Sequence, residues 1–412
     1  MSTKRIAVIG AGPVGLEAAL YGTYLGHDLQ IYERGRVGEN IRRWGHVSLF
    51  SPERMNRSQL AVLQLDRADL PLSDDERYLT GRQFVEQQLE PLAHCEPLAG
   101  RIHEGCTVIR VGRERIGKSD LVGGPRDRYP FRLLLEQDAR ERIVNADVVL
   151  DCSGTYGHHN WMGSGNLPAP GELRLKDRIA YTLEDIAGRH RDRYAGKHVL
   201  LVGSGHSAAT ALDALIRLPG TQVLWITKAD RERPHELIPD DPLPERARLS
   251  GLANGLAAGS HPQVTYRRAT VVERVEERDG GFGVTLRSTD REQTVTVDRI
   301  LAHVGYSPDN SLYRELQVHE CYATFGPIRL AAALLGDSSS DCLAQSARGA
   351  EVLENPEPGF FILGAKSYGK NSRFLIRIGL EQVREVYSLI EDRPELNLYA
   401  SEGETDHAIE RR

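Results

Sequence analysis

A glycine-rich turn near the N-terminus restricts the fold more than any other stretch of this 412-residue chain. The apolar run at residues 6–9 predicts a buried strand, and Gly10, Gly12 and Gly15 follow it in the pattern GxGxxG. Such glycines permit a tight turn, a close backbone approach to a pyrophosphate, and close packing of a helix on the strand. The next apolar run ends at Glu33, where a carboxylate accepts hydrogen bonds from an adenosine ribose. The stretch therefore predicts a dinucleotide-binding domain.

The same pattern returns near the middle of the chain. A short apolar run precedes Gly203 and Gly205, with Ala208 in the third position, and predicts a second dinucleotide-binding domain. The next strand is not followed by an acidic residue, because Lys228 and Arg231 stand there instead. A positive charge at that point accepts the 2′-phosphate of NADPH, which a carboxylate would repel. We therefore expect NADPH, with NADH as the alternative if these side chains form only a solvated surface.

Composition limits the partners of the chain. The net charge of -6 argues against nucleic acid and against a membrane surface, and favours a small-molecule substrate. No apolar run approaches the roughly 18 residues of a membrane span. The five cysteines form no CxxC pair, and neither they nor the histidines have metal-ligand spacing. We expect no metal and a reducing compartment. The first residues predict a strand and a turn rather than a signal peptide, which favours a cytoplasmic protein.

The segments after the two turns repeat one order. In each half, short strands lead to a small-residue turn, at Gly154 in the first half and at Gly305 in the second. A strand and a helix at residues 360–390 complete the first module, so the second is inserted into it. We predict an α/β protein with two Rossmann-like dinucleotide-binding domains, each with a β-meander. The expected boundaries are 1–175 and 309–395 for the first domain, 176–308 for the inserted second domain, and 396–412 for a mobile tail.

This order of motifs resembles the flavoproteins with two dinucleotide-binding domains, which include the thioredoxin-reductase-like enzymes and the flavin-containing monooxygenases. The resemblance covers nearly the whole chain, and it implies FAD in the first domain and NAD(P)H in the second. Together with the spacing and charge of each turn, it gives a set of predicted cofactor-binding residues. For FAD they are Gly10, Gly12, Pro13, Gly15, Glu33, Arg34, Trp44, Gly154, Gly364 and Lys366. For the nicotinamide nucleotide they are Gly203, Gly205, His206, Ser207, Lys228 and Arg231.

Different features favour different branches of this class. Thioredoxin-reductase chemistry needs a cysteine pair beside the flavin, and we interpret the single Cys152 as a small buried residue rather than a reactive thiol. Trp44 and Ser51 resemble the monooxygenase stretch that lines the flavin, with a core aromatic as the alternative for Trp44. The FxGxxxHxxxY fingerprint of the flavin-containing monooxygenases is absent. His46 is either a proton donor near the flavin or a partly exposed loop histidine.

Three functions stay open at this point. We favour an FAD- and NADPH-dependent monooxygenase that uses O2 on a small molecule. The second function is an FAD/NAD(P)H reductase or dehydrogenase without oxygenation, and the third is a non-catalytic flavin-binding sensor. The candidate catalytic residues are His46, Ser51 and Lys366. The proline- and glycine-rich stretch 234–262 is expected to be a surface excursion that reaches the substrate or a second copy of the chain, which leaves a homodimer open.

The segment at residues 359–379 departs most from the resembling class. In that class a strand ends in Gly-Asp, whose carboxylate meets the ribityl chain of FAD, whereas Lys366 stands in the place of that aspartate here. We expect a helix from about Arg373, beside Lys366 and Lys370, with positive charge near the N1 to C2=O edge of reduced flavin. The alternative is that these cations face solvent or bind the phosphates of FAD.

Overall fold

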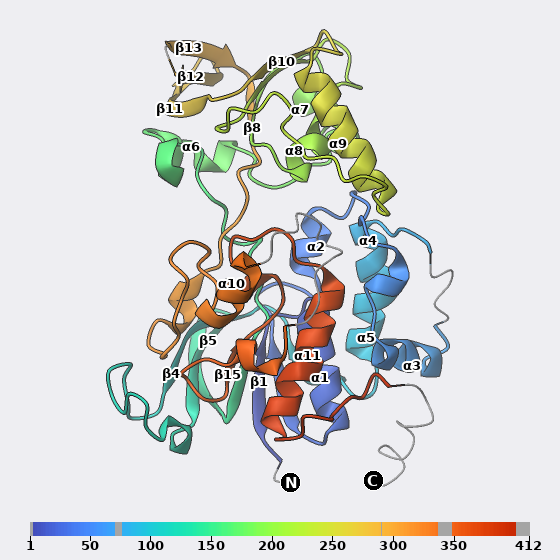
Figure 1. Cartoon of the computed structure of the whole chain (residues 1–412), viewed down its shortest axis with the longest axis vertical. Coiled ribbons are helices and arrows are strands. Elements are labelled where there is room, and N and C mark those ends of the chain that lie inside the picture. The colour runs from blue at the N-terminus through green and yellow to red at the C-terminus, as the bar shows by residue number, and fades with distance from the viewer. Residues whose placement is uncertain (1–2, 71–75, 290, 337–347, 401–412) are drawn as a thin grey trace. The chain divides into compact units, whose positions relative to one another are not determined.

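The computed structural model describes residues 3–70, 76–289, 291–336 and 348–400 (Figure 1). The chain forms two compact units. Unit 1 consists of residues 1–158 and 307–412, and unit 2 consists of residues 159–306. Unit 2 is thus an insertion into unit 1, and it includes residues 159–175, which the sequence had assigned to the first domain.

The chain leaves and re-enters unit 1 at neighbouring points. Within unit 1, the amide of Ser307 donates a hydrogen bond of 2.9 Å to the carbonyl of His158. Within unit 2, the amide of Asn160 donates a hydrogen bond of 3.0 Å to the carbonyl of Gly305. Each unit therefore holds the two ends of its own chain segments together.

Unit 1 is built on a parallel β-sheet. Its strands, in spatial order, are β15 (Phe360–Ile362), β7 (Val148–Asp151), β1 (Arg5–Ile9), β2 (Asp28–Tyr32) and β3 (Ile102–His103). The central strands are apolar and almost entirely buried, as expected for a parallel sheet between covering layers. Helix α1 (Pro13–Tyr24) and helix α11 (Ile376–Ile390) lie next to each other over this sheet (Figure 1).

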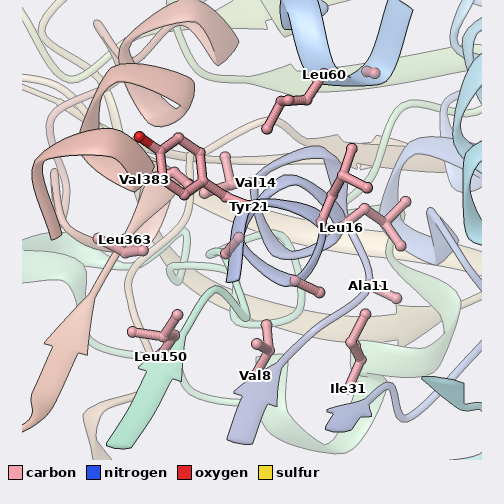
Figure 2. Close-up of a cluster of buried hydrophobic side chains, with 14 of the residues drawn as sticks. Val8, Ala11, Val14, Leu16, Tyr21, Ile31, Leu60, Leu150, Leu363 and Val383 are labelled. Atoms are coloured by element: carbon pink, nitrogen blue, oxygen red, sulfur yellow. The ribbon is translucent and has the colours of Figure 1, made fainter. Parts of the chain in front are cut away.

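The core of unit 1 lies between the sheet and these helices. Figure 2 shows Val8, Ile31 and Leu150 projecting from neighbouring strands towards α1, and all three side chains are buried. The contact between the two helices depends on a glycine. A side-chain carbon at Gly379 of α11 would lie 2.4 Å from a methyl carbon of Val14 in α1, so only glycine permits this approach.

The other elements of unit 1 surround this core. The helices are α2 (Glu39–Arg43), α3 (Gln59–Arg67), α4 (Gly81–Phe84), α5 (Glu90–His94) and α10 (Ile328–Leu335). A separate antiparallel sheet consists of β4 (Cys106–Arg113), β5 (Phe131–Gln137) and β6 (Arg140–Ala146). It is the β-meander that the sequence predicted for this domain.

The last described residues are anchored to the core. Leu396 and Leu398 are buried, and the hydroxyl of Tyr399 donates a hydrogen bond of 2.9 Å to Oε1 of Glu17 in α1. The prediction of a mobile tail from residue 396 is therefore wrong for residues 396–400, because the sparse apolar side chains there are the ones that pack. Residues 401–412 lie outside the described part of the chain.

Unit 2 repeats the arrangement on a smaller scale. Its parallel sheet has the order β10 (Val264–Arg267), β9 (Gln222–Ile226), β8 (His198–Val202) and β14 (Arg299–Ala302). Its meander consists of β11 (Val271–Arg278), β12 (Gly281–Arg287) and β13 (Glu292–Val297). The helices are α6 (Glu172–Leu175), α7 (Arg191–Tyr194), α8 (His206–Leu215) and α9 (Pro244–Ala257). The predicted fold class, an α/β protein with two Rossmann-like domains, each with a β-meander, is confirmed.

Helix α9 corrects the expected surface excursion at residues 234–262. The helix begins with Pro244 in its first turn, where a missing amide hydrogen has no cost, and it runs for 14 residues. Leu249, Ala253 and Leu256 are buried at helical spacing. Apolar packing on this face therefore overrides the low helix propensity of the glycines within it. No helix of the described ranges is both long enough and apolar enough to cross a membrane.

Candidate functional site

The glycine turn of unit 1 forms a cradle at the carboxyl end of β1. Gly10 has φ +99°, and a side-chain carbon there would lie 2.9 Å from the carbonyl oxygen of Cys152. A carbon at Gly15 would collide with the oxygen of Gly10 at 1.9 Å. At Gly12, by contrast, a carbon would meet nothing within 4 Å, so the space over the start of α1 is open. Pro13 occupies the first helical position.

The turn of unit 2 has the same form at the carboxyl end of β8. Gly203 has φ +127°, and a side-chain carbon there would lie 2.1 Å from the carbonyl oxygen of His303. A carbon at Gly205 would meet nothing within 4 Å, and Ala208 is fully buried where a third glycine often stands. Both turns therefore place open space in front of a helix N-terminus, which is the position of a pyrophosphate in Rossmann domains.

Glu33 closes the turn of unit 1 from the neighbouring strand. Its Oε2 accepts a hydrogen bond of 2.9 Å from the amide of Ala11, and its Oε1 accepts one of 2.8 Å from the amide of Gly35. A carboxylate oxygen accepts more than one hydrogen bond, so both oxygens retain capacity for ribose hydroxyls. Arg34 is exposed, and its guanidinium lies against Gly157, three residues after Gly154.

The predicted flavin-lining segment takes part in packing. The indole of half-buried Trp44 covers Gly81 and lies 6.4 Å from the ring of Tyr156, measured between centroids. Its Nε1 is buried and has no hydrogen-bond partner among the described residues. The hydroxyl of Ser51 is buried and donates to Oδ1 of Asn56 at 2.8 Å, while His46 is half-buried. Of these residues, Trp44 alone offers a donor that the described protein does not use.

Lys366 lies in a buried triangle at the carboxyl edge of the unit 1 sheet. Its Nζ donates to Oδ2 of Asp151 at 2.7 Å and to Oγ of Ser153 at 3.1 Å. The Ser153 hydroxyl donates in turn to Oδ1 of Asp151 at 2.6 Å. The exposed fraction is 1% for the Lys366 side chain and 0% for the Asp151 side chain. Asp151 thus compensates a charge that the sequence assigned to the flavin, and no sequence spacing indicated this partner.

The other cations of the segment are dispersed. Lys370 lies over the ring of Phe325 at 4.3 Å from its centroid, and Arg377 pairs with Glu381 at 3.1 Å. Helix α11 begins at Ile376 rather than at about Arg373, and a short 3-10 turn occupies residues 364–366. Arg377 therefore lies in the first turn of the helix, where Glu381 is its ion-pair partner.

Cys152 is an unreactive thiol by its surroundings. Removal from water raises its pKa well above the ordinary value, and the negative charge of Asp151 raises it further, while Lys366 acts in the opposite direction. The thiolate is the reactive form of cysteine, so a thiol held protonated is a poor nucleophile. The structure has Cys152 half-buried rather than fully buried, and its raised pKa agrees with the interpretation that it is not a reactive thiol.

The predicted nicotinamide-nucleotide residues lie around the turn of unit 2. His206 and Ser207 begin α8 and are half-buried. Lys228 and Arg231 follow β9 and are exposed, so both are free of the core of the unit. The described residues contain no group of three or more His, Cys, Asp or Glu that would hold a metal ion.

The loop after β9 and helix α9 add residues that the sequence did not indicate. Ser250 of α9 forms a hydrogen bond of 3.2 Å with Nε2 of His206. Asn254, one turn later, accepts from the amide of His235 at 3.0 Å and donates to its carbonyl at 2.9 Å. The rings of His206 and His235 lie 4.9 Å apart at 79°. A polar stripe at positions i, i+4 and i+8 of α9, beginning at Arg246, is the pattern that could have revealed them.

Solved structures that share this fold come from two kinds of enzyme. The bacillithiol disulfide reductase of Bacillus cereus superposes with a TM-score of 0.69 at 17% identity, over 95% of this chain and 100% of that chain. The ornithine N-hydroxylase of Kutzneria sp. 744 has a TM-score of 0.61 at 15% identity, over 95% and 100%. The thioredoxin reductase of Lactococcus lactis has a TM-score of 0.59 at 14% identity, over 95% and 99%.

These similarities define the architecture of the chain. No protein-family model and no curated protein sequence matches it. The chain has the fold of the reductases and hydroxylases with two Rossmann-type nucleotide-binding domains, as the sequence predicted.

Proposed function

We propose that the protein is an FAD-dependent oxidoreductase that uses NAD(P)H and acts on a small molecule. The observation that carries this proposal is the presence of two complete glycine cradles, one in each unit, where a side-chain carbon at Gly10 or Gly203 would strike backbone. The fold itself requires glycine at Gly10 and Gly203, but not at Gly12 and Gly205, where a side-chain carbon would meet nothing within 4 Å, so the close approach of a ligand accounts for these two. Among the structural neighbours, the Kutzneria hydroxylase structure contains reduced FAD, NADP+ and ornithine.

The residues of unit 1 fit FAD. The open space at Gly12 suits the pyrophosphate, the free lone pairs of Glu33 suit the ribose, and the unpartnered Nε1 of Trp44 is a donor for a polar atom of the bound group. When bound, a flavin accepts a hydride from a nicotinamide and passes electrons to a second substrate. Unit 2 would bind the nicotinamide nucleotide, and Lys228 and Arg231 favour NADPH because their charge suits a 2′-phosphate.

Within this class we favour a monooxygenase in the cytoplasm. Such an enzyme consumes one NADPH, one proton and one O2 for each substrate, and transfers one oxygen atom to the substrate and the other to water. The choice is supported by the absence of a CxxC pair in the sequence and by the raised pKa of Cys152, both of which disfavour a dithiol relay. A reductase without oxygenation is the second candidate, since disulfide reductases share the fold.

One experiment separates these functions. The purified protein is titrated with NADPH, and in parallel with NADH, without oxygen while the visible absorbance of its flavin is followed. Bleaching by NADPH at lower concentrations than NADH is the expected result, because of Lys228 and Arg231. Oxygen is then admitted with candidate amines or disulfides, and the products are identified. A colourless protein that takes up no added FAD would overturn the proposal, and a flavin that neither nucleotide reduces would indicate a sensor.

A further inference from the structure

Helix α9 presents three polar residues to the nucleotide turn of unit 2. Arg246, Ser250 and Asn254 are spaced four residues apart, so they lie on one face of the helix. Arg246 and Ser250 are buried, as is the ion pair of Arg246 with Asp241 at 2.6 Å. A polar face directed into a folded unit needs partners, and the partners of Ser250 and Asn254 are two histidines.

His206 is the first of these histidines and the first residue of the ten-residue helix α8. Its Nε2 is held by Ser250 at 3.2 Å. The amide groups at the start of a helix are not all used within the helix and favour a negatively charged ligand. His206 is thus fixed at the point where a phosphate group of a dinucleotide would lie.

His235 is the second histidine, and it supplies an independent indication of a ligand. Its exposed fraction is 7%, and its Nε2 is buried with no hydrogen-bond partner among the described residues. Asn254 clamps the backbone of His235 on both sides, so the ring is held in place beside His206. A buried polar atom without a partner is costly, and a ligand that supplies the partner removes this cost.

Both imidazoles are neutral near physiological pH in the protein alone. Burial lowers the pKa of His206, Arg246 lowers it further, and Asp241 acts in the opposite direction. Burial lowers the pKa of His235 to about 4, with a smaller effect from His206. A phosphate placed against these rings would reverse the effect, because an adjacent negative charge favours the protonated imidazole.

We propose that His206 and His235 contact the phosphates of the nicotinamide nucleotide, and that these imidazoles take up a proton from solvent when the nucleotide binds. This inference rests on the proposed function, since it assumes that unit 2 binds NAD(P)H. It adds a proton to the binding equilibrium and assigns α9 the role of holding the two histidines in place. Proton uptake sets the direction in which the affinity for the nucleotide changes with pH. The complex holds more protons than the free protein, so affinity rises as the pH falls through the raised pKa of the complex, and levels off below the pKa of the free protein.

The test is isothermal titration of NADP+ into the purified flavoprotein, in buffers of different ionisation enthalpy, at about pH 6 and about pH 8. The dependence of the heat on the buffer gives the number of protons taken up. The 2′-phosphate of NADP+ itself titrates near pH 6. The comparison is therefore made between the wild type and His206→Gln, His206→Asn and His235→Gln, all with the same ligand. His198→Gln is the matched control, because His198 is exposed at the opposite end of strand β8.

We expect proton uptake to fall in the variants of His206 and His235 and to stay unchanged in His198→Gln. We also expect His206→Gln to weaken NADP+ binding about tenfold at the lower pH, since it removes a charge-assisted hydrogen bond. Thermal unfolding of each variant checks the fold, and His206→Gln retains a neutral amide near the position of Nε2 that can still bond Ser250. NADP+ binding with unchanged proton uptake in all variants would overturn the inference and leave the proposed function intact. Absence of NADP+ and NADPH binding in the wild type would instead overturn the proposed function.

Discussion

The carboxyl edges of the two parallel sheets carry glycine turns of the same form, but the polar groups beside the two turns differ in charge. At the edge of unit 1, the buried polar groups are charged, and Lys366 is compensated by Asp151 at 2.7 Å. At the edge of unit 2, neutral rings lie beside the turn, in addition to the buried ion pair of Arg246 with Asp241. Nε1 of Trp225 donates to the carbonyl of Gly203 at 2.7 Å, and burial lowers the pKa of both His235 and His303 to about 4.

This difference shows that the same glycine turn can be surrounded by polar groups whose hydrogen-bond and ion-pair partners differ. When two charges are paired inside the protein, removal of either partner lowers the stability of the fold. A neutral ring whose nitrogen has no hydrogen-bond partner in the protein can receive that partner from a ligand. We therefore expect substitutions at the edge of unit 1 to act on stability, and substitutions at the edge of unit 2 to act on binding.

The largest effect is expected for Lys366→Met. The substitution leaves Asp151 buried without a cation, which should lower the free energy of unfolding by roughly 3–5 kcal/mol. Chemical denaturation measures this loss. The double variant Asp151→Asn, Lys366→Met should recover most of it, because both charges are then removed. The matched control is Lys370→Met, because Lys370 is half-buried over the exposed ring of Phe325, and its loss should change stability by about 1 kcal/mol or less. Equal losses in the free energy of unfolding for the two lysine variants would show that the buried pair of Lys366 and Asp151 contributes no more than an exposed contact.

The second effect concerns a carboxyl group of unit 1 that has no cation. Glu17 is buried, and burial raises its pKa from 4.5 to about 7 against the opposing hydrogen bonds of Ser58 and Tyr399. Between these two pH values the folded state keeps a proton that the unfolded state has released. The free energy of unfolding should therefore fall as the pH rises through this range, by about 3 kcal/mol in total.

Glu17→Gln should remove this pH dependence. Urea unfolding at about pH 5 and about pH 8 measures it, and the variant should gain stability relative to the wild type at the higher pH. Glu86→Gln serves as the control, since Glu86 is an exposed acid in the same unit. If Glu17→Gln and the wild type lost stability in parallel over this range, the carboxyl of Glu17 would not be the titrating group.

The smallest effects are expected from alanine in the two cradles. Gly10→Ala should weaken FAD binding and Gly203→Ala should weaken NADP+ binding, each by roughly tenfold to a hundredfold, because the backbone conformations are strained for alanine. The loss should be greater in unit 2, where the added carbon lies 2.1 Å from a carbonyl oxygen rather than 2.9 Å. Fluorescence titration of each cofactor measures the affinities. Gly112→Ala is the control, because a carbon there meets nothing within 4 Å. Loss of both cofactors in both variants would contradict separate cradles.

The sequence was informative where the physics is local. The strand, turn and helix around Gly10 and Gly203 follow from residue type and spacing, and the structure contains them. The pairing of Lys366 with Asp151 could not be predicted in this way, because 215 residues separate them. The last residues were taken for a tail since Leu396 and Leu398 are isolated in a polar stretch, yet each finds a place in the core.

Helix α9 shows a different limit. The prolines and glycines of residues 234–262 indicate a surface excursion by composition, but Pro244 starts the helix, and Gly251 and Gly255 lie within it. The candidate site was likewise predictable only where it depends on local sequence. The residues of the two turns were predicted, whereas the α9 residues that hold His206 and His235 depend on the packing of α9 against α8.

The points at which the chain enters and leaves unit 2 bear on how such a protein can arise. His158 and Ser307 are already joined by a hydrogen bond within unit 1, as are Asn160 and Gly305 within unit 2. A gene segment encoding residues 159–306 can therefore be gained, lost or exchanged at one place in the ancestral coding sequence without rebuilding either core. These two backbone contacts make unit 2 a segment that can be exchanged as a whole, so under the proposed function the electron donor could evolve separately from the flavin.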